Sequence, residues 1–382
     1  MNQKEVGELR RRLSPDKNAI SHIYGCYVNG SKEMIADLDA SVGVITQEDA
    51  EEYLSLLKKT LSGTLGRNLI DLAFTAEQVI EGEEHRLLSQ LRDSKLADGK
   101  LRQDFYQKII NAVDMEGNYL ILLAHDAYEV PQRGQDGEWQ DDASETVFTY
   151  ILCCVCPVRD GKLELGYFSQ ENAFHSYAPS QTVAPPEMGF LFPAFDDRAA
   201  NLYGALLYTR RADELPYSFI DAVFHAEPPL SAAQQREGFE TALSDALEEQ
   251  CSADVVQAVH EQLCAKIQLH KESRDPEPLL VTAAEVGDVL AGCGVGQERV
   301  AAFCEKCDEQ FGRGAELRPD NLIDSKRFEI KTGETVISVA PQDSYLVETR
   351  VIDGRKYILI PADEGVEING LPVGIAREMQ EA

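Results

Sequence analysis

Five titratable residues belong to the region of apolar stretches that we predict to form a sheet. They are His125, Asp126, His175, Asp196 and Asp197. Imidazole and carboxylate groups gathered at the end of a sheet can perform acid–base catalysis or metal-dependent hydrolysis, and burial there perturbs their pKa values. If the five side chains converge, they form a hydrolase site at the ends of a central sheet.

The positions of the same residues also fit a structural role. Neighbours on a strand point to opposite faces of a sheet, so His125 and Asp126 cannot serve one site unless the strand ends there. Asp197 and Arg198 follow a strand rich in Phe, where they can form a local ion pair or cap a turn. Structural hydrogen bonding is therefore the alternative for these polar groups.

A turn with two glycines separates a predicted helix from a predicted strand. Its candidate binding residues are Ser62, Gly63, Thr64, Gly66 and Arg67. Backbone amides in such a turn, together with an arginine, can hold a nucleotide phosphate or another anion. A tight turn that needs small residues explains the same sequence, so both interpretations stay open.

The motifs of several enzyme classes are missing. No GxxxxGK followed by Ser or Thr occurs, which argues against an NTPase of the P-loop type. No GxSxG occurs either, which disfavours an α/β-hydrolase. Cys304 and Cys307 form a lone CxxC on a predicted helix, where packing is favoured over zinc binding because no second ligand pair is evident. We expect no metal and no cofactor.

Charge is the strongest global feature of the 382 residues. The chain has 36 Lys and Arg against 66 Asp and Glu, a formal net charge of −30. Such a charge repels phosphate backbones and anionic lipids, so nucleic-acid binding across a broad surface is disfavoured. No apolar run approaches the ~18 residues of a membrane span. With no signal-like N-terminus and nine irregularly spaced cysteines, we expect a cytoplasmic protein with reduced thiols.

Residues 1–115 are predicted to form an N-terminal α/β region. A hairpin turns at Asn29-Gly30, and Thr75 with Gln78 forms a capping pattern that opens one of the helices. The predicted elements are helices at 3–13, 46–61, 75–91 and 100–113 and a hairpin at 20–39.

Residues 116–228 are predicted to form the central sheet. Five apolar and aromatic runs alternate with turns, and no helix of ten residues fits between them. The sheet is therefore expected to be largely antiparallel, with a hairpin at Asp160-Gly161 and a loop at the acidic insert 134–142.

The remaining third divides into a helical region at 229–312 and a small β module at 313–382. Capping patterns at Ser231 and Thr282 open two of the helices, and Asp353-Gly354 and Asn369-Gly370 are hairpin signals. The fold class that follows is α+β: an N-terminal α/β region, a central largely antiparallel sheet, a helical segment and a C-terminal β module.

Four segments together resemble a bacterial family known as the domain of unknown function numbered 4317. They are KKTLSGTLGRNLIDL at 58–72, EGNYLILLAHDAYEVP at 116–131, GFLFPAFDDRAANLYGALLYT at 189–209 and VETRVIDGRKYILI at 347–360. Their order and the chain length also resemble that family. The resemblance implies a bacterial cytosolic origin and brings no catalytic residues with it.

Missing catalytic motifs and a layout of several α and β modules favour a non-catalytic protein that binds a protein or a small-molecule partner. A large apolar or aromatic surface patch would mark that role. A hydrolase at the ends of the central sheet and anion binding at 62–67 stay open as alternatives. The sequence leaves the oligomeric state open, a homo-oligomer included.

Overall fold

The computed structural model describes residues 1–15, 17–133, 139–140, 147–161, 164–177, 181–363, 365–368 and 370–374. The chain forms two compact units. Unit 1 consists of Met1–Gln234 and Pro276–Pro278, and unit 2 consists of Gln235–Asp275 and Leu279–Ala382. Most of the insert at 134–142, expected to be a loop, lies outside the described residues.

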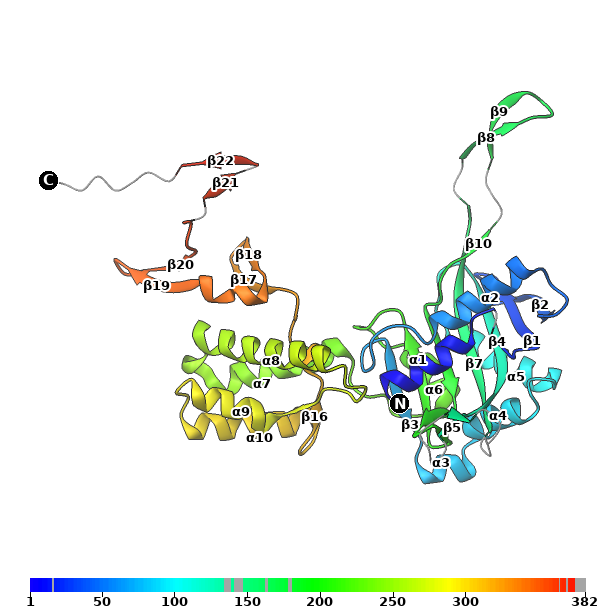
Figure 1. The fold of residues 1–382 in the computed structure, drawn as a ribbon, viewed down its shortest axis with the longest axis horizontal. Helices are drawn as coiled ribbons and strands as arrows, with labels where there is room; N and C mark the ends of the chain where they lie inside the picture. Colours follow the sequence, from blue (N-terminus) through cyan, green and yellow to red (C-terminus); the bar gives the residue numbers. More distant parts are fainter. Residues whose placement is uncertain are drawn as a thin grey trace. The chain divides into compact units, whose positions relative to one another are not determined.

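An eight-stranded antiparallel sheet forms the centre of unit 1 (Figure 1). The strand order is β2-β1-β4-β7-β11-β14-β3, and β10 pairs with one end of β7. This sheet confirms the predicted α+β class and its antiparallel character. The bounds are β1 His22–Val28, β2 Met34–Ser41, β3 Leu69–Ala73, β4 Asn118–Glu129, β7 Val147–Arg159, β10 Thr182–Val183, β11 Met188–Phe192 and β14 Gly204–Thr209.

Strands β4 and β7 lie next to each other in the interior of this sheet. They pair in unbroken register from Asn118 opposite Val158 to Glu129 opposite Val147. Ile121 belongs to one hydrophobic core and its neighbour Leu122 to the other. Both faces are therefore buried, which explains why these strands are continuous apolar runs in the sequence and do not alternate with polar residues.

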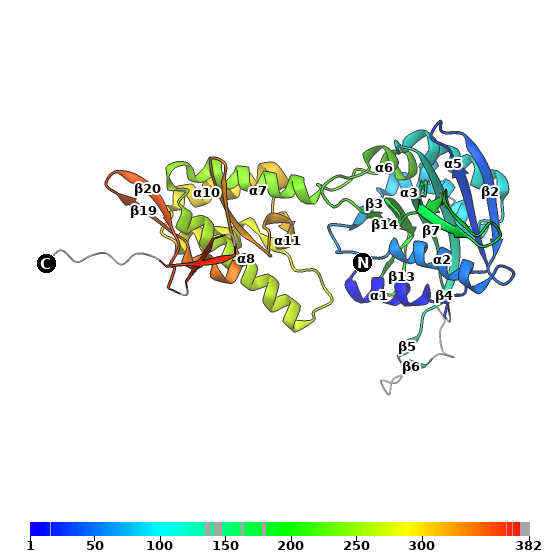
Figure 2. The ribbon, with the colours of Figure 1, turned by 90° about the horizontal axis from the view of Figure 1, so that it is seen from above.

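Helices cover both faces of the sheet (Figure 2). On one face, α1 (Gln3–Arg12) and α2 (Gln47–Lys59) bury Leu9 and Leu54 in the core that contains Leu122. On the other face, α4 (Glu83–Asp93), α5 (Gly99–Ala112) and α6 (Tyr217–Phe224) bury Leu88, Phe105 and Phe219. Unit 1 is thus a three-layer arrangement of helix, sheet and helix.

Both expected regions, 1–115 and 116–228, contribute strands to this one sheet. Strands β1 and β2 lie at one edge and β3 at the other, while the strands between them come from the later part of the chain. The sheet is therefore complete only when segments far apart in the sequence have paired.

The prediction of a single helix at 75–91 is wrong. The segment is divided into α3 (Ala76–Glu81) and α4, because Gly82 is extended at φ −63 and ψ 130 and ends the first helix. Glycine disfavours a helix interior by about 1 kcal/mol relative to alanine, which makes it a natural break point. The predicted capping box of Thr75 and Gln78 is confirmed.

The hairpin expected at Asp160-Gly161 is also wrong. Strand β8 (Glu164–Phe168) pairs with β9 (Ala173–Tyr177), while Arg159 at the end of β7 pairs with β10. The short strand β9 was missed because its five residues, AFHSY, do not form a continuous apolar run. Two further strand pairs in unit 1 are β5 (Gln132–Arg133) with β6 (Trp139–Gln140) and β12 (Ala194–Asp196) with β13 (Ala199–Asn201).

Unit 2 is built on helices around a core that contains Phe239, Leu263, Leu290 and Phe303. The predicted capping box of Thr282 and Glu285 opens α9. Among the residues that the structure describes, no helix has the length and apolar character needed to cross a bilayer. The helices are α7 (Ala232–Leu247), α8 (Ala253–Ser273), α9 (Ala283–Gly292), α10 (Gln297–Phe311) and α11 (Pro319–Leu322), with 3₁₀ turns η2 (Glu248–Gln250) and η3 (Pro341–Leu346) and the strand pair β15 (Val281–Thr282) and β16 (Glu316–Leu317).

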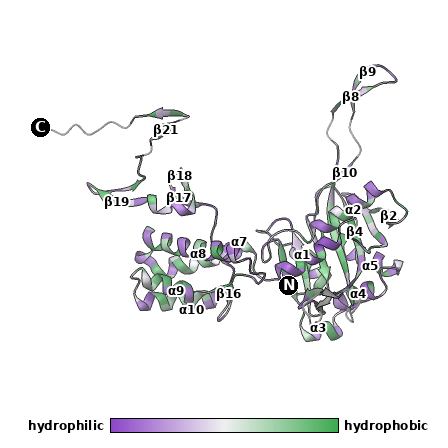
Figure 3. Cartoon of the chain, in the orientation of Figure 1, coloured by the Kyte–Doolittle hydropathy of each residue, from purple (hydrophilic) through white to green (hydrophobic). Residues whose placement is uncertain are grey.

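Three hairpins follow these helices in the described part of the chain. Asp353 and Gly354 have φ of 49 and 75 and form the predicted two-residue turn, whereas Asn369 of the other predicted turn lies outside the described residues. Within the described residues, each hairpin pairs only within itself, and apolar side chains such as Val351 and Leu371 are exposed. Figure 3 shows hydrophobic residues among hydrophilic ones along these strands. The strands are β17 (Phe328–Thr332), β18 (Thr335–Val339), β19 (Glu348–Ile352), β20 (Arg355–Leu359), β21 (Val366–Ile368) and β22 (Leu371–Val373).

Gly189 in β11 lies where the end of α2 approaches the sheet closely. A Cβ at this position would lie 2.3 Å from the backbone oxygen of Cys153 and 2.7 Å from Cγ2 of Thr60. We expect Gly189→Ala to lower the free energy of unfolding by about 3 kcal/mol, measured by urea denaturation. Gly43→Ala is the control, because nothing lies within 4 Å of its Cβ position. Equal losses in the two variants would contradict the assignment.

Candidate ligand-binding pocket

Asp126 is a buried residue that is fully engaged by its neighbours. Arg12 of α1 donates to its two carboxylate oxygens over 3.0 and 3.2 Å, and the Tyr150 hydroxyl donates over 2.7 Å. The backbone N–H of Ala127 donates a further bond of 2.8 Å. With its carboxylate only 1% exposed, Asp126 anchors α1 to the sheet.

This anchoring role of Arg12 was missed in the sequence, where Arg12 belongs to a run of three arginines at the end of a helix. A signal for it exists: Arg12 lies three residues after the buried Leu9, at the border of the same helix face. The Arg12 guanidinium also stacks on the Tyr128 ring at 4.4 Å. Burial opposes the charge on Arg12, but its hydrogen bond and Coulombic attraction to Asp126 raise its pKa.

Asp196 and Asp197 lie at the hairpin of β12 and β13. One carboxylate oxygen of Asp196 lies 2.6 Å from the Met1 ammonium, and the other accepts a hydrogen bond of 2.7 Å from the Asn201 side-chain amide. Burial raises the pKa of Asp196, but these two hydrogen bonds outweigh it and leave the pKa lowered. Asp197 and Arg198, both at positive φ, form the turn itself, which agrees with the turn role considered for them.

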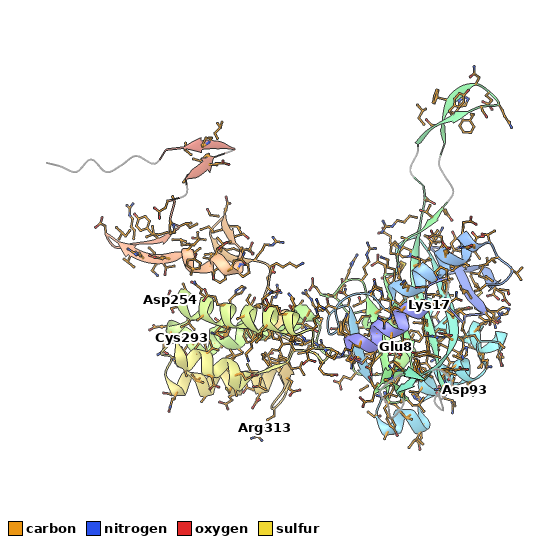
Figure 4. The ribbon with its side chains drawn as sticks, viewed as in Figure 1. Glu8, Lys17, Asp93, Asp254, Cys293 and Arg313 are labelled. Carbon is orange, nitrogen blue, oxygen red and sulfur yellow. The ribbon has the colours of Figure 1, made fainter. Side chains whose placement is uncertain are left out.

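The Arg198 side chain contacts α1 and the segment before β5. Its guanidinium donates to Glu8 of α1 over 2.7 Å and to the carbonyl of Pro131 over 3.0 Å (Figure 4 labels Glu8). The Tyr128 hydroxyl donates to the other oxygen of Glu8. The β12–β13 hairpin is therefore a second point at which α1 is held to the sheet.

His125 is half-buried on the opposite face of β4 from Asp126. It lies opposite Ile151, which belongs to the core under α4 and α5. Burial lowers the pKa of its imidazole; Asp126 opposes this shift, and Lys95 and Arg92 add to it. The strand does not end at this point, so the two side chains are directed apart.

His175 lies on the β8–β9 hairpin with an exposed side chain. Its ring contacts Glu171 of the same hairpin at 2.8 Å. The five candidate residues thus occupy three places: Asp126 and the Asp196-Asp197 turn beneath α1, His125 beneath α4, and His175 on a separate hairpin. The structure does not bring their side chains together.

Several backbone groups of the turn at 62–67 are hydrogen-bonded within the turn or to its flanking residues. The backbone N–H groups of Ser62, Gly66 and Arg67 donate to the carbonyls of Lys59, Leu69 and Thr64. The Ser62 hydroxyl also donates to the Lys59 carbonyl, over 2.6 Å. Gly63, at φ 121, has no room for a Cβ, which would lie 2.5 Å from Cβ of Asn68. These contacts are those of a tight turn between α2 and β3.

A pocket of about 670 Å³ opens at one end of the sheet in unit 1. The register explains its place, because Val158 lies opposite Asn118 and Met188 lies opposite both Val155 and Thr209. Strand ends, the end of α5 and the start of α6 therefore meet there. The lining segments are 112–116, 157–159, 187–188, 209, 211 and 214–219.

The floor of the pocket is apolar. Val113, Leu215 and Phe219 belong to the core beneath α5 and α6, and Met115 and Met188 pack against that core. These side chains reach the pocket from three different segments, so the floor is held by the packing of unit 1.

The rim of the pocket is charged. Glu187 pairs with Arg210 at 2.8 Å, and Glu214 lies 3.5 Å from Arg211. Asp114, Glu116 and Arg159 have exposed side chains and form no side-chain hydrogen bond or ion pair within the described part of the chain. Charges of both signs are thus available to a bound molecule.

None of the pocket residues was identified from the sequence. They come from separate segments, and each segment is an ordinary strand or helix end without a motif. The feature that unites them is the strand register, which sequence periodicity does not contain.

The described residues include no group of three or more His, Cys, Asp and Glu arranged to hold a metal ion. Cys307 is buried in the core of unit 2, and Cys304 lies 3.8 Å from the Ala283 carbonyl. Both thiols of the CxxC pair therefore contact neighbouring parts of the helical core.

The Asp126 anchor gives the first prediction for this region. Asp126→Ala leaves Arg12, whose side chain is 19% exposed, without its carboxylate partner, and we expect a loss of about 3 kcal/mol in the free energy of unfolding. Asp93→Ala is the control, since it removes another Asp–Arg pair whose carboxylate is 64% exposed (Figure 4). Its loss should stay below about 1 kcal/mol. Similar losses in urea denaturation would refute the anchoring role.

The lowered pKa of His125 gives a pH-dependent prediction. A folded-state pKa below that of the unfolded chain, about 6.5, means that the unfolded chain binds more protons as the pH falls. We expect the free energy of unfolding to decrease from pH 7.5 to 5.5, and to decrease less in His125→Gln. His175→Gln, altered at an exposed ring, should follow the wild type. An identical decrease in all three proteins would contradict this expectation.

Comparison with known proteins shows which family the chain belongs to. No curated protein matches the chain. The family model described as a domain of unknown function, DUF4317, matches residues 1–371. The match confirms the resemblance that the four sequence segments carry, and its description includes no activity. It covers nearly the whole sequence, and the chain therefore belongs to the DUF4317 family.

Proposed function

We propose that the chain is a non-catalytic ligand-binding protein that holds a small organic molecule in the pocket of unit 1. The observation that carries this proposal is the pocket of about 670 Å³, with an apolar floor and a charged rim. Its volume is within the range of about 300–1,000 Å³ that small-molecule sites occupy.

The chemistry of the lining supports binding. An apolar floor supplies affinity through buried area, while a few charged groups at the rim orient the bound molecule. Because the floor residues are part of the packed core, the site needs little rearrangement to accept a ligand. Such preorganisation reduces the entropy lost on binding.

The positions of the predicted catalytic residues also favour binding over hydrolysis. Asp126 already accepts bonds from Arg12 and Tyr150. Neither His125 nor His175 lines the pocket. A hydrolase needs its acid and base within hydrogen-bond reach of one reacting group, and these side chains are directed to different places.

Filling the pocket tests the proposal. N-phenyl-1-naphthylamine, a neutral fluorophore that brightens in apolar surroundings, is titrated into the wild type and into Met188→Trp. Met188 lines the pocket, so the larger side chain should occupy the floor and weaken binding about tenfold, or 1.4 kcal/mol. Ile80→Trp, at a residue 78% exposed on α3, is the control and should bind as the wild type does. Equal binding by all three proteins would refute the proposal.

A further inference from the structure

The unpaired charges at the rim restrict what the pocket can hold. Four of the lining residues are carboxylates and two are arginines, so the lining carries more negative than positive charge. A ligand with only phosphate or carboxylate groups would meet repulsion from Asp114 and Glu116. A ligand with only positive charge would meet Arg159 without offering it a partner.

The register places the free charges of opposite sign near one another. Asn118 of β4 lies opposite Val158 of β7. Arg159 is the residue after Val158, and Glu116 lies two residues before Asn118, so both are at the same end of this strand pair. Asp114 belongs to the same connection between α5 and β4. One end of the pocket therefore offers two carboxylates and a guanidinium, each exposed and each available to a ligand.

The apolar floor lies in the same pocket as this charged end. Val113 and Met115 alternate with Asp114 and Glu116 along the connection, and all four line the pocket. A molecule that pairs with the rim charges can therefore place an apolar group against the floor.

We propose that the pocket binds a zwitterionic short peptide with apolar side chains, of about dipeptide size. This inference rests on the proposed function. The ammonium group of the peptide pairs with Asp114 and Glu116, its carboxylate pairs with Arg159, and its side chains contact the floor. This ligand satisfies both signs of charge at once, whereas a neutral, purely anionic or purely cationic molecule leaves at least one rim charge without a partner.

Isothermal titration calorimetry with L-leucyl-L-phenylalanine tests this inference. The comparison ligands are its N-acetyl form, which lacks the ammonium charge, and its C-terminal amide, which lacks the carboxylate. We expect each blocked form to bind at least about tenfold more weakly than the free dipeptide.

Two variants assign the contacts. Arg159→Gln should lower the affinity for the free dipeptide and leave the affinity for the amide unchanged. Glu116→Gln should lower the affinity for the free dipeptide and leave the affinity for the N-acetyl form unchanged. Both residues are exposed, so the substitutions should leave the fold intact, which circular dichroism checks. Arg86→Gln, at a side chain 62% exposed on α4, is the control.

The outcomes separate the two proposals. Binding of the neutral fluorophore without binding of the dipeptide, or equal binding of free and blocked dipeptides, overturns the zwitterion inference and leaves the pocket as a binding site. Failure of both probes, with Met188→Trp indistinguishable from the wild type, overturns the binding function as well. Tighter binding of the free dipeptide that depends on Arg159 and Glu116 supports both.

Discussion

Burial of β4 and β7 on both faces is the constraint from which the rest of unit 1 follows. Ile121 and Leu122 are neighbours in sequence and enter different cores, so helices must cover the sheet on each side. The helices α1 and α2 cover one face and α4, α5 and α6 the other. A two-stranded pair buried in this way is stable only inside a wider sheet, and the N-terminal strands complete it at both edges.

The same constraint explains the polar network beneath α1. A helix packed on a fully apolar sheet gains little orientation from apolar contacts alone, since those contacts are not directional. Asp126 and the Arg198 turn supply direction by hydrogen bonding Arg12 and Glu8 of the helix. A buried ion pair contributes little net stability, because desolvation offsets the attraction, yet loss of one member leaves an uncompensated charge. The pair therefore fixes the position of α1 more than it stabilises the fold.

With both faces covered, the described pocket of unit 1 opens at the ends of the strands. The end at which β7 and β14 finish and β11 begins contains the pocket, with core side chains as its floor and loop charges as its rim. Rigid strands thereby position residues that belong to the connections between them. The hairpins at 328–373 differ from this design, since each exposes apolar side chains and pairs only within itself.

The sequence by itself determined the α+β class, the antiparallel sheet, most helix starts and the family. Capping by Thr46, Thr75 and Thr282 depends on residues three apart, and alternation of apolar runs with turns is equally local. Only the tertiary structure decided that Arg12 pairs with Asp126, that β3 joins the far edge of the sheet, and which strand ends surround the pocket. Those facts depend on register and on contacts between residues more than a hundred positions apart, and local periodicity carries no information about either.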